Sequence, residues 1–182
     1  MRSVLYTITA EHIAEIAAIH ATSWRSAYRG VLRDEFLQSD LVRNRTELWS
    51  RRLLNKPQRH FGFISRVDDR AVGFAFAFGD EDDEWGTQLD NLHVVPEYKG
   101  QGIGKQLLSA IATTCVAQCQ QPTLHLWVYE ANTQAQEFYA RLGAQRGERL
   151  VIQAPGGGEV PEYRYYWPSS KALAHYLLPD DT

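Results

Sequence analysis

Residues 94–108 read Val-Val-Pro-Glu-Tyr-Lys-Gly-Gln-Gly-Ile-Gly-Lys-Gln-Leu-Leu and decide the fold of this chain. An apolar run leads into glycines at positions 100, 102 and 104, and an amphipathic helical pattern follows them. Glycine lets backbone N–H groups converge without an obstructing Cβ, and a helix N-terminus adds the positive end of a dipole. The stretch therefore predicts a strand, an anion-binding loop and a helix. A plain strand-to-helix turn is the alternative interpretation.

The size and composition of the chain favour one domain. Its 182 residues are 44% hydrophobic, which is enough for a substantial core. Because the net charge is −3, we expect no nucleic-acid partner. No apolar stretch approaches the roughly 20 residues of a membrane span, and the first seven residues are too polar for a signal peptide. We therefore expect no membrane partner and a cytoplasmic location.

Two cysteines, Cys115 and Cys119, lie four residues apart on one predicted helix. This spacing disfavours a disulfide, and two thiols are too few for a structural zinc site. No histidine is placed to activate either thiol, which argues against a covalent thiol mechanism. We expect reduced packing residues and no bound metal.

The residues before the glycine loop predict helices followed by an antiparallel sheet. We expect strands at 4–9, 60–67, 71–79 and 87–95, with Asp68-Asp69-Arg70 as a hairpin turn. Apolar residues at helical spacing predict one helix after Thr9 and a second helical region from Phe36 to Pro57, separated by Gly30.

The residues after the loop predict a βαβ unit and a final hairpin. Apolar spacing predicts a helix over 102–118, and the strand at 123–128 should then lie parallel to the strand before the loop. A helix over 132–142, strands at 145–153 and 162–167, and a short helix from Ser169 complete the chain. The expected fold class is α/β (α+β), with a mixed, mostly antiparallel sheet and helices on both faces. Residues 1–168 form the core of the single domain, and 169–182 form a C-terminal extension.

Two common phosphate-binding motifs do not fit the loop. A P-loop needs Gly-x-x-x-x-Gly-Lys followed by Ser or Thr, and this spacing is absent. A dinucleotide fingerprint needs Gly-x-Gly-x-x-Gly and an acidic residue about 20 positions later, whereas this loop is Gly-x-Gly-x-Gly and residues 123–126 hold no carboxylate. Neither class of nucleotide site is therefore expected.

A third pattern does match: a basic residue, two further residues, Gly, one residue and Gly, at Lys99, Gly102 and Gly104. About 30 residues later follows Asn-Thr-Gln-Ala-Gln-Glu-Phe-Tyr-Ala-Arg-Leu-Gly, residues 132–143. Together the two motifs resemble those of the GNAT superfamily, the GCN5-related N-acetyltransferases, in which Arg or Gln usually stands at the place of Lys99. The resemblance covers about residues 4–167. It implies six to seven strands, with the fourth and fifth splayed apart.

The resemblance implies acetyl-CoA as the donor, bound in the gap between the splayed strands. The pantetheine arm would pair with main-chain groups of Leu92, His93 and Val94. Asn132 would contact the same arm, although a helix N-cap is an equally simple role for it. The pyrophosphate would bind the loop backbone, at Lys99, Gly100, Gln101, Gly102, Ile103, Gly104 and Lys105.

Acyl transfer to an amine needs a deprotonated nucleophile, a stabilised oxyanion and a proton for the departing thiolate. The resemblance implies that Tyr139 supplies this proton and that the backbone N–H of Val94 binds the oxyanion. A core aromatic is the alternative role for Tyr139.

The general base is open among Asp90, Glu130 and His93. Strand alternation places Asp90 with Gln88 and Leu92 on one face, and Asn91 with His93 on the other, unless a bulge near Leu92 intervenes. Each of the three candidates also has an ordinary structural role open to it, as a strand-end group, a loop carboxylate or a packing residue.

Trp24 and Tyr28 lie four residues apart and share one helical face. They can line an acceptor pocket and hold a cationic amine, or simply pack this helix on the sheet.

The expected function is direct transfer of an acetyl group from acetyl-CoA to a primary amine of a small molecule or a protein. A non-catalytic acyl-CoA-binding module is the alternative. Since many family members are dimers, a homodimer is compatible with the resemblance.

Overall fold

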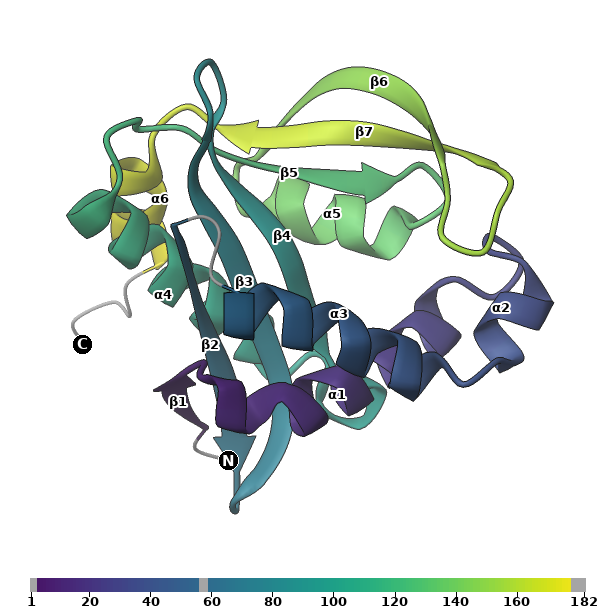
Figure 1. Cartoon of the computed structure of the whole chain (residues 1–182). Coiled ribbons are helices and arrows are strands. Elements are labelled where there is room, and N and C mark those ends of the chain that lie inside the picture. The colour runs from purple at the N-terminus through teal and green to yellow at the C-terminus, as the bar shows by residue number, and fades with distance from the viewer. Residues whose placement is uncertain (1–2, 56–58, 178–182) are drawn as a thin grey trace.

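The computed structural model describes residues 3–55 and 59–177. In these ranges one sheet has seven strands in the order β1-β2-β3-β4-β5-β7-β6 (Figure 1). The strands are β1 (Val4–Thr7), β2 (His60–Val67), β3 (Arg70–Asp82), β4 (Gly86–Val94), β5 (Leu124–Tyr129), β6 (Gln145–Gln153) and β7 (Glu159–Trp167). The mixed, mostly antiparallel sheet confirms the predicted fold class.

Helices cover both faces of this sheet. They are α1 (Ile13–Ala27), α2 (Asp34–Gln38), α3 (Leu41–Asn55), α4 (Ile103–Gln118), α5 (Thr133–Arg141) and α6 (Ser170–Leu177). Figure 1 shows α1 and α3 on one face, and α4, α5 and α6 on the other. Within the described ranges, no helix combines the length and the apolar character that crossing a membrane requires.

The β4–β5 pair is the parallel pair that the βαβ pattern predicts. These strands are joined only at Thr87↔Leu124 and Gln88↔His125, near the start of each strand. Beyond these two pairs no ladder joins them, although both strands continue for several residues. The predicted splay between the fourth and fifth strands is therefore present, and it leaves an opening through the sheet.

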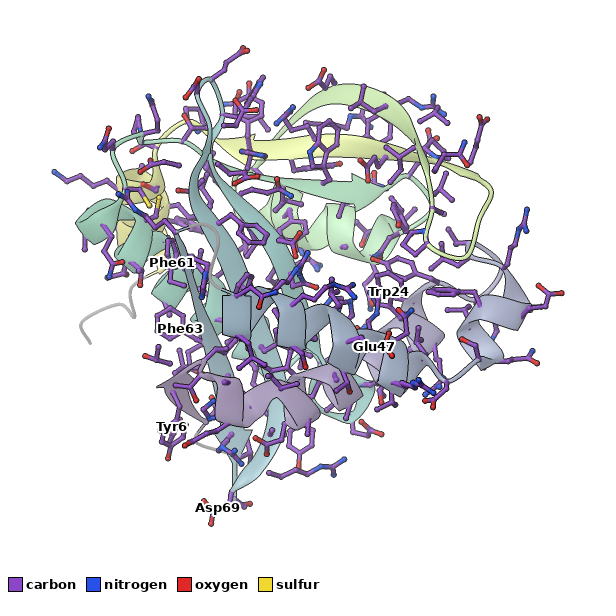
Figure 2. The ribbon with its side chains drawn as sticks, in the orientation of Figure 1. Tyr6, Trp24, Glu47, Phe61, Phe63 and Asp69 are labelled. Atoms are coloured by element: carbon purple, nitrogen blue, oxygen red, sulfur yellow. The ribbon has the colours of Figure 1, made fainter. Side chains whose placement is uncertain are left out.

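The core lies between the sheet and its two helical layers. The α4 side chains Ile103, Leu107 and Ile111 are almost completely buried, as the predicted apolar stripe requires. On the opposite face, Trp49 of α3 packs against Phe74 and Phe76 of β3, with ring centroids 5.3 and 5.0 Å apart. Each such side chain contributes about 1.5–3 kcal/mol of burial energy, which fixes both helical layers on the sheet. Figure 2 draws the side chains on the ribbon, with Trp24 of α1 and Phe61 of β2 among those labelled.

Several predicted boundaries differ from the structure. β1 ends at Thr7 rather than residue 9, β3 continues to Asp82, and β7 begins at Glu159. The second helical region is two helices, because the Asp40 carboxylate accepts a hydrogen bond from the Arg43 amide at 3.1 Å and so caps a new helix. Its last predicted residues, 56 and 57, lie outside the described ranges.

A bulge in β4 overturns the predicted strand faces. Phe76 pairs with Asn91 and Ala77 with Leu89, so Asp90 is an extra residue without a partner on β3. The Asp90 carboxylate consequently reaches Arg52 on α3 and lies on the same face as Asn91 and His93. The grouping of Asp90 with Leu92 was therefore wrong, and the bulge near Leu92 that was named as the exception is present.

Candidate active site

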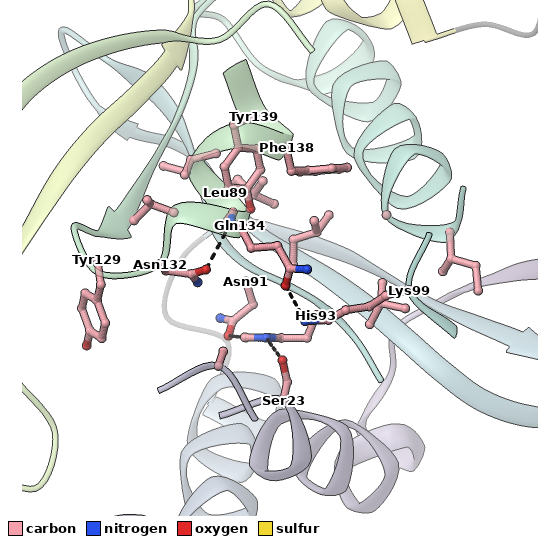
Figure 3. Close-up of a pocket in the computed structure, with 18 of the residues that line it drawn as sticks. Ser23, Leu89, Asn91, His93, Lys99, Tyr129, Asn132, Gln134, Phe138 and Tyr139 are labelled. Atoms are coloured by element: carbon pink, nitrogen blue, oxygen red, sulfur yellow. Dashed lines mark hydrogen bonds between the residues drawn. The ribbon is translucent and has the colours of Figure 1, made fainter. Parts of the chain in front are cut away.

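A cavity of about 620 Å³ occupies the opening between β4 and β5. It is lined from both faces of the sheet, by Ser23 and Trp24 of α1, by Tyr28 just after this helix, and by Phe138 and Tyr139 of α5. In Figure 3, Ser23 lies on one side of the cavity, Tyr139 on the other, and Asn91 and His93 between them. The cavity therefore connects the two helical layers through the sheet.

Most predicted site residues line this cavity. They are Trp24, Tyr28, Asp90, Leu92, His93, Val94, Lys99, Gly100, Gly102, Ile103, Gly104, Lys105, Asn132 and Tyr139. Gln101 and Glu130 are not among its lining residues. The topology thus brings together segments that are more than 100 residues apart in the sequence.

The glycine loop forms one end of the cavity. Gly100 and Gly102 have φ angles of +77° and +83°, in the left-handed region that favours glycine. Gly102 is the N-cap of α4, and the first turn of that helix holds no acidic side chain. Its first amides have no partner within the helix and point out of its N-terminus. These donors suit an anion such as a diphosphate.

Two further loop residues fix the position of α4. Gly104 packs against α5, since a Cβ at this position would lie 3.3 Å from the Phe138 ring. The Lys99 ammonium donates to Gln134 Oε1 at 3.2 Å, so the unusual residue of the loop motif bridges to α5.

At the start of α5, Asn132 Oδ1 accepts from the Ala135 amide at 3.2 Å, which confirms the N-cap role. A contact of Asn132 with a pantetheine arm stays a prediction.

Tyr139 is a core aromatic residue that also reaches the cavity, and its role as a proton donor stays a prediction. Its ring packs against Phe138, Tyr165 and Trp167, with centroids 5.2, 6.5 and 6.0 Å away, and it is also part of the cavity wall. Burial, together with the nearby Tyr28 phenol, raises the pKa of Tyr139 well above its usual range. The phenol is therefore neutral and carries a proton that it can donate.

Asp90 and Asn91 begin a polar chain across the α1 face of β4. Arg52 holds the Asp90 carboxylate with two hydrogen bonds, of 2.5 and 3.3 Å. Asn91 Nδ2 donates to the same carboxylate. The Asn91 side-chain oxygen therefore faces His93 Nε2 at 3.2 Å and accepts a hydrogen bond from it.

His93 continues this chain to α1. Because Nε2 carries the hydrogen, Nδ1 accepts a hydrogen bond from the Ser23 hydroxyl at 2.9 Å. Burial, with contributions from Lys99 and Arg45, lowers the pKa of His93 to about 3. The imidazole is therefore neutral at neutral pH, and it is a weak base.

Glu130 lies just beyond β5 and does not line the cavity. Arg149 Nη2 donates to its carboxylate at 2.7 Å, and the Tyr163 hydroxyl donates at 2.8 Å. These two hydrogen bonds lower the pKa of Glu130. Its contacts are therefore those of a structural loop carboxylate.

The opposite end of the cavity has aromatic walls. Trp24 lies 5.5 Å from Tyr28, and Tyr28 lies 5.0 Å from Tyr129, between ring centroids. The Arg45 guanidinium covers Trp24 at 4.4 Å. Trp24 and Tyr28 thus pack this segment on the sheet and also line the cavity, whereas their contact with an acceptor amine stays a prediction.

Sequence reasoning missed Ser23 and Glu162, both of which line the cavity. Glu162 is 8% exposed and comes from β7, which pairs with β5 through Tyr129↔Glu162. The sequence does hold a signal for Glu162. In residues 162–167, Glu162 and Arg164 are charged and all other residues are aromatic. In the described residues no cluster of three or more His, Cys, Asp or Glu side chains is arranged to hold a metal ion.

Comparison with known proteins decides the family. A family model described as "Acetyltransferase (GNAT) family" matches residues 14–144, well over half of the chain. The chain belongs to the GNAT family. The match extends from α1 to the end of α5 and includes the glycine loop and Tyr139.

Several relatives of this GNAT chain are named as acetyltransferases. An uncharacterized N-acetyltransferase of Bacillus subtilis, YuaI, is 26% identical over 171 residues, which cover 92% of this chain and 94% of that protein. N-alpha-acetyltransferase 30 of Schizosaccharomyces pombe is 31% identical over 124 residues, which cover 66% of this chain and 73% of that protein. Family and relatives together identify an acyltransferase enzyme.

Solved structures share the GNAT fold. A GCN5-related N-acetyltransferase from Rhodopseudomonas palustris superposes with a TM-score of 0.71 at 21% identity, covering 91% of this chain and 95% of that one. The PaiA N-acetyltransferase from Thermoplasma acidophilum, in complex with coenzyme A, gives a TM-score of 0.68 at 18% identity, covering 89% and 98%. At these identities the likeness shows the fold alone.

Proposed function

We propose that this GNAT enzyme transfers the acetyl group of acetyl-CoA directly to a primary amine. The observation that carries the proposal is the cavity itself, which passes between β4 and β5 from the glycine loop to the aromatic side of α1. A donor that enters over the loop and an amine that enters from α1 would meet in this opening. Such a meeting places the two reactants within reach of each other, which lowers the entropic cost of the reaction.

The donor end fits a coenzyme A diphosphate. The diphosphate would bind the backbone amides of residues 99–105. The positive φ angles of Gly100 and Gly102 support this role. The pantetheine arm would lie beside Leu92, His93 and Val94, where β4 has no partner strand on the β5 side. The Thermoplasma relative, which was solved with coenzyme A, supports the choice of donor.

Tyr139 is the proposed proton donor to the departing thiolate. Its phenol is neutral, lies in the cavity wall and comes from α5, on the donor side of the sheet. The Val94 amide is the proposed oxyanion donor. Both roles follow the family resemblance, and the geometry places both residues on the same cavity.

Calorimetry and a thiol-release assay test this proposal together. Acetyl-CoA should bind with a micromolar dissociation constant, and free thiol should appear when primary amines are added. Binding without turnover on any amine would favour the alternative, a non-catalytic acyl-CoA-binding module. Absence of acetyl-CoA binding would contradict both interpretations.

A further inference from the structure

Glu162 and Arg164 are neighbours on one face of β7 and are equally buried, at 8% exposure each. Arg164 is fully partnered: Glu148 accepts its hydrogen bond at 2.7 Å, and its guanidinium lies 4.5 Å from the Trp85 ring and 4.4 Å from the Trp127 ring. In the described part of the chain, no hydrogen bond or ion pair joins the Glu162 carboxylate to another group. Among the described residues, the buried charge of Arg164 is thus paired and that of Glu162 is not.

The Glu162 side chain belongs to the acceptor end of the cavity. It lines the cavity, and β7 alternation puts it on the face of Arg164, opposite the face on which Tyr165 meets Tyr139 of α5. Strand pairing sets it beside Tyr129 of β5. The titratable groups that face it are the phenols of Tyr28, just after α1, and Tyr129 of β5. Burial raises the pKa of each phenol, and the Glu162 charge adds to the increase.

A buried carboxylate without a partner costs free energy, so the fold is expected to match it with a cation when the site is filled. The neighbouring rings of Tyr28 and Tyr129 add faces that attract a cation. Most primary amines are ammonium ions at neutral pH, and they must lose a proton before they can attack a carbonyl carbon. This end of the cavity therefore suits an ammonium group.

We propose that Glu162 binds the ammonium group of the acceptor and takes the proton that the nitrogen must lose before it attacks the thioester. This inference rests on the acetyltransferase function proposed above and names its substrate class, a primary alkylamine that arrives protonated. Burial raises the pKa of the Glu162 carboxyl, which makes it a stronger base than an exposed glutamate.

One N–H bond of the ammonium breaks and its proton moves to a Glu162 oxygen, so the nitrogen regains a lone pair. This pair forms the C–N bond to the acetyl carbon, and the C–S bond breaks with its electron pair on sulfur. A second nitrogen proton reaches the thiolate through the Tyr139 hydroxyl, and Glu162 releases its proton to solvent. The products are the N-acetyl amine, the coenzyme A thiol and one proton.

Two probe amines of nearly equal shape separate this role from a structural one. 2-Phenylethylamine is an ammonium ion at neutral pH, whereas O-benzylhydroxylamine is neutral and needs no base. Glu162→Gln should lower kcat/KM for 2-phenylethylamine about 100-fold and for O-benzylhydroxylamine less than about threefold. In the variant, the rate with 2-phenylethylamine should rise with pH, because only amine that is deprotonated in solution can react.

The matched control is Glu159→Gln, which changes an exposed carboxylate on the same strand, outside the cavity. It should leave both rates unchanged, and both variants should bind acetyl-CoA as tightly as the parent enzyme. Equal losses with the two amines, or no loss with either, would overturn the role of Glu162. If the parent enzyme binds no acetyl-CoA, the proposed function itself fails; if it binds acetyl-CoA but acetylates neither probe, the substrate class is wrong.

Thermal unfolding gives a second readout that does not depend on turnover. Because the folded-state pKa of Glu162 is raised, its contribution to stability is present below the unfolded-state pKa and is lost as the pH rises through the folded-state value. Glu162→Gln removes this loss, so the variant should melt at the same temperature as the parent or higher at neutral pH. A clear drop in the melting temperature would show that Glu162 is a structural residue and would overturn the proposal.

Discussion

The two ends of the cavity are built in different ways. The donor end is a continuous stretch of backbone, with two left-handed glycines at the N-terminus of α4. The acceptor end consists of side chains from α1, β5 and β7, including Tyr28, Tyr129 and Glu162. A loop that binds through amides suits one fixed ligand, whereas a pocket of side chains can change with the acceptor. We therefore expect the donor end to be specific for one kind of ligand and the acceptor end to determine which amine is used.

Removing the Tyr139 hydroxyl should have the largest effect. Tyr139→Phe should lower kcat about 100-fold and leave the affinity for acetyl-CoA nearly unchanged, because the hydroxyl is needed only as the thiolate forms. Steady-state rates with a primary amine, combined with calorimetry, measure both quantities. The control is Tyr165→Phe, a buried tyrosine of the same ring cluster that does not line the cavity. An unchanged kcat in Tyr139→Phe, where chemistry limits the rate, would remove this residue from the mechanism.

A matched pair of glycine variants tests the donor end. Gly102 and Gly143 have φ angles of +83° and +82°, and a Cβ at either position would meet no atom within 4 Å. Replacing either by Ala should cost a similar amount of stability, about 1 kcal/mol. Only Gly102→Ala should weaken acetyl-CoA binding, by about tenfold, because only this residue belongs to the loop. Equal affinities in the two variants would contradict a phosphate-binding role for the loop.

The hydroxyl of Ser23 should contribute least. It donates to His93 Nδ1, and His93 is neutral because burial lowers its pKa to about 3. Loss of one such hydrogen bond costs about 1 kcal/mol, so Ser23→Ala should lower kcat/KM for the amine by about fivefold or less. A drop of more than about 100-fold would place Ser23 and His93 in the proton path and would weaken the case for Glu162.

The donor end could be predicted because its signal is local. The glycine spacing and the Asn132–Gly143 motif each lie within a dozen residues, so the loop, α4 and α5 were expected where they occur. The parallel β4–β5 pair followed from the helix between the strands. Local spacing therefore predicted the loop and its helices, and the family resemblance that these motifs carry implied the opening in the sheet and the residues on its donor side.

The acceptor end depends on strand register, which no local pattern shows. Glu162 reaches the cavity because β7 pairs with β5, 33 positions earlier in the chain. The bulge at Asp90 turns this carboxylate toward Arg52, a change that one extra residue in β4 causes. Asp90 and Glu130, both considered as bases, are held by arginines. Glu162, whose carboxylate has no hydrogen bond or ion pair within residues 3–55 and 59–177, was not considered.

Initial-rate kinetics test the central claim most directly. The claim is that donor and amine occupy one cavity together and that the acetyl group passes between them through the opening of the sheet. With acetyl-CoA and a primary amine both varied, double-reciprocal plots should give intersecting lines, as a ternary complex requires. Parallel lines, together with an acetylated enzyme isolated in the absence of amine, would show a covalent intermediate and contradict the account.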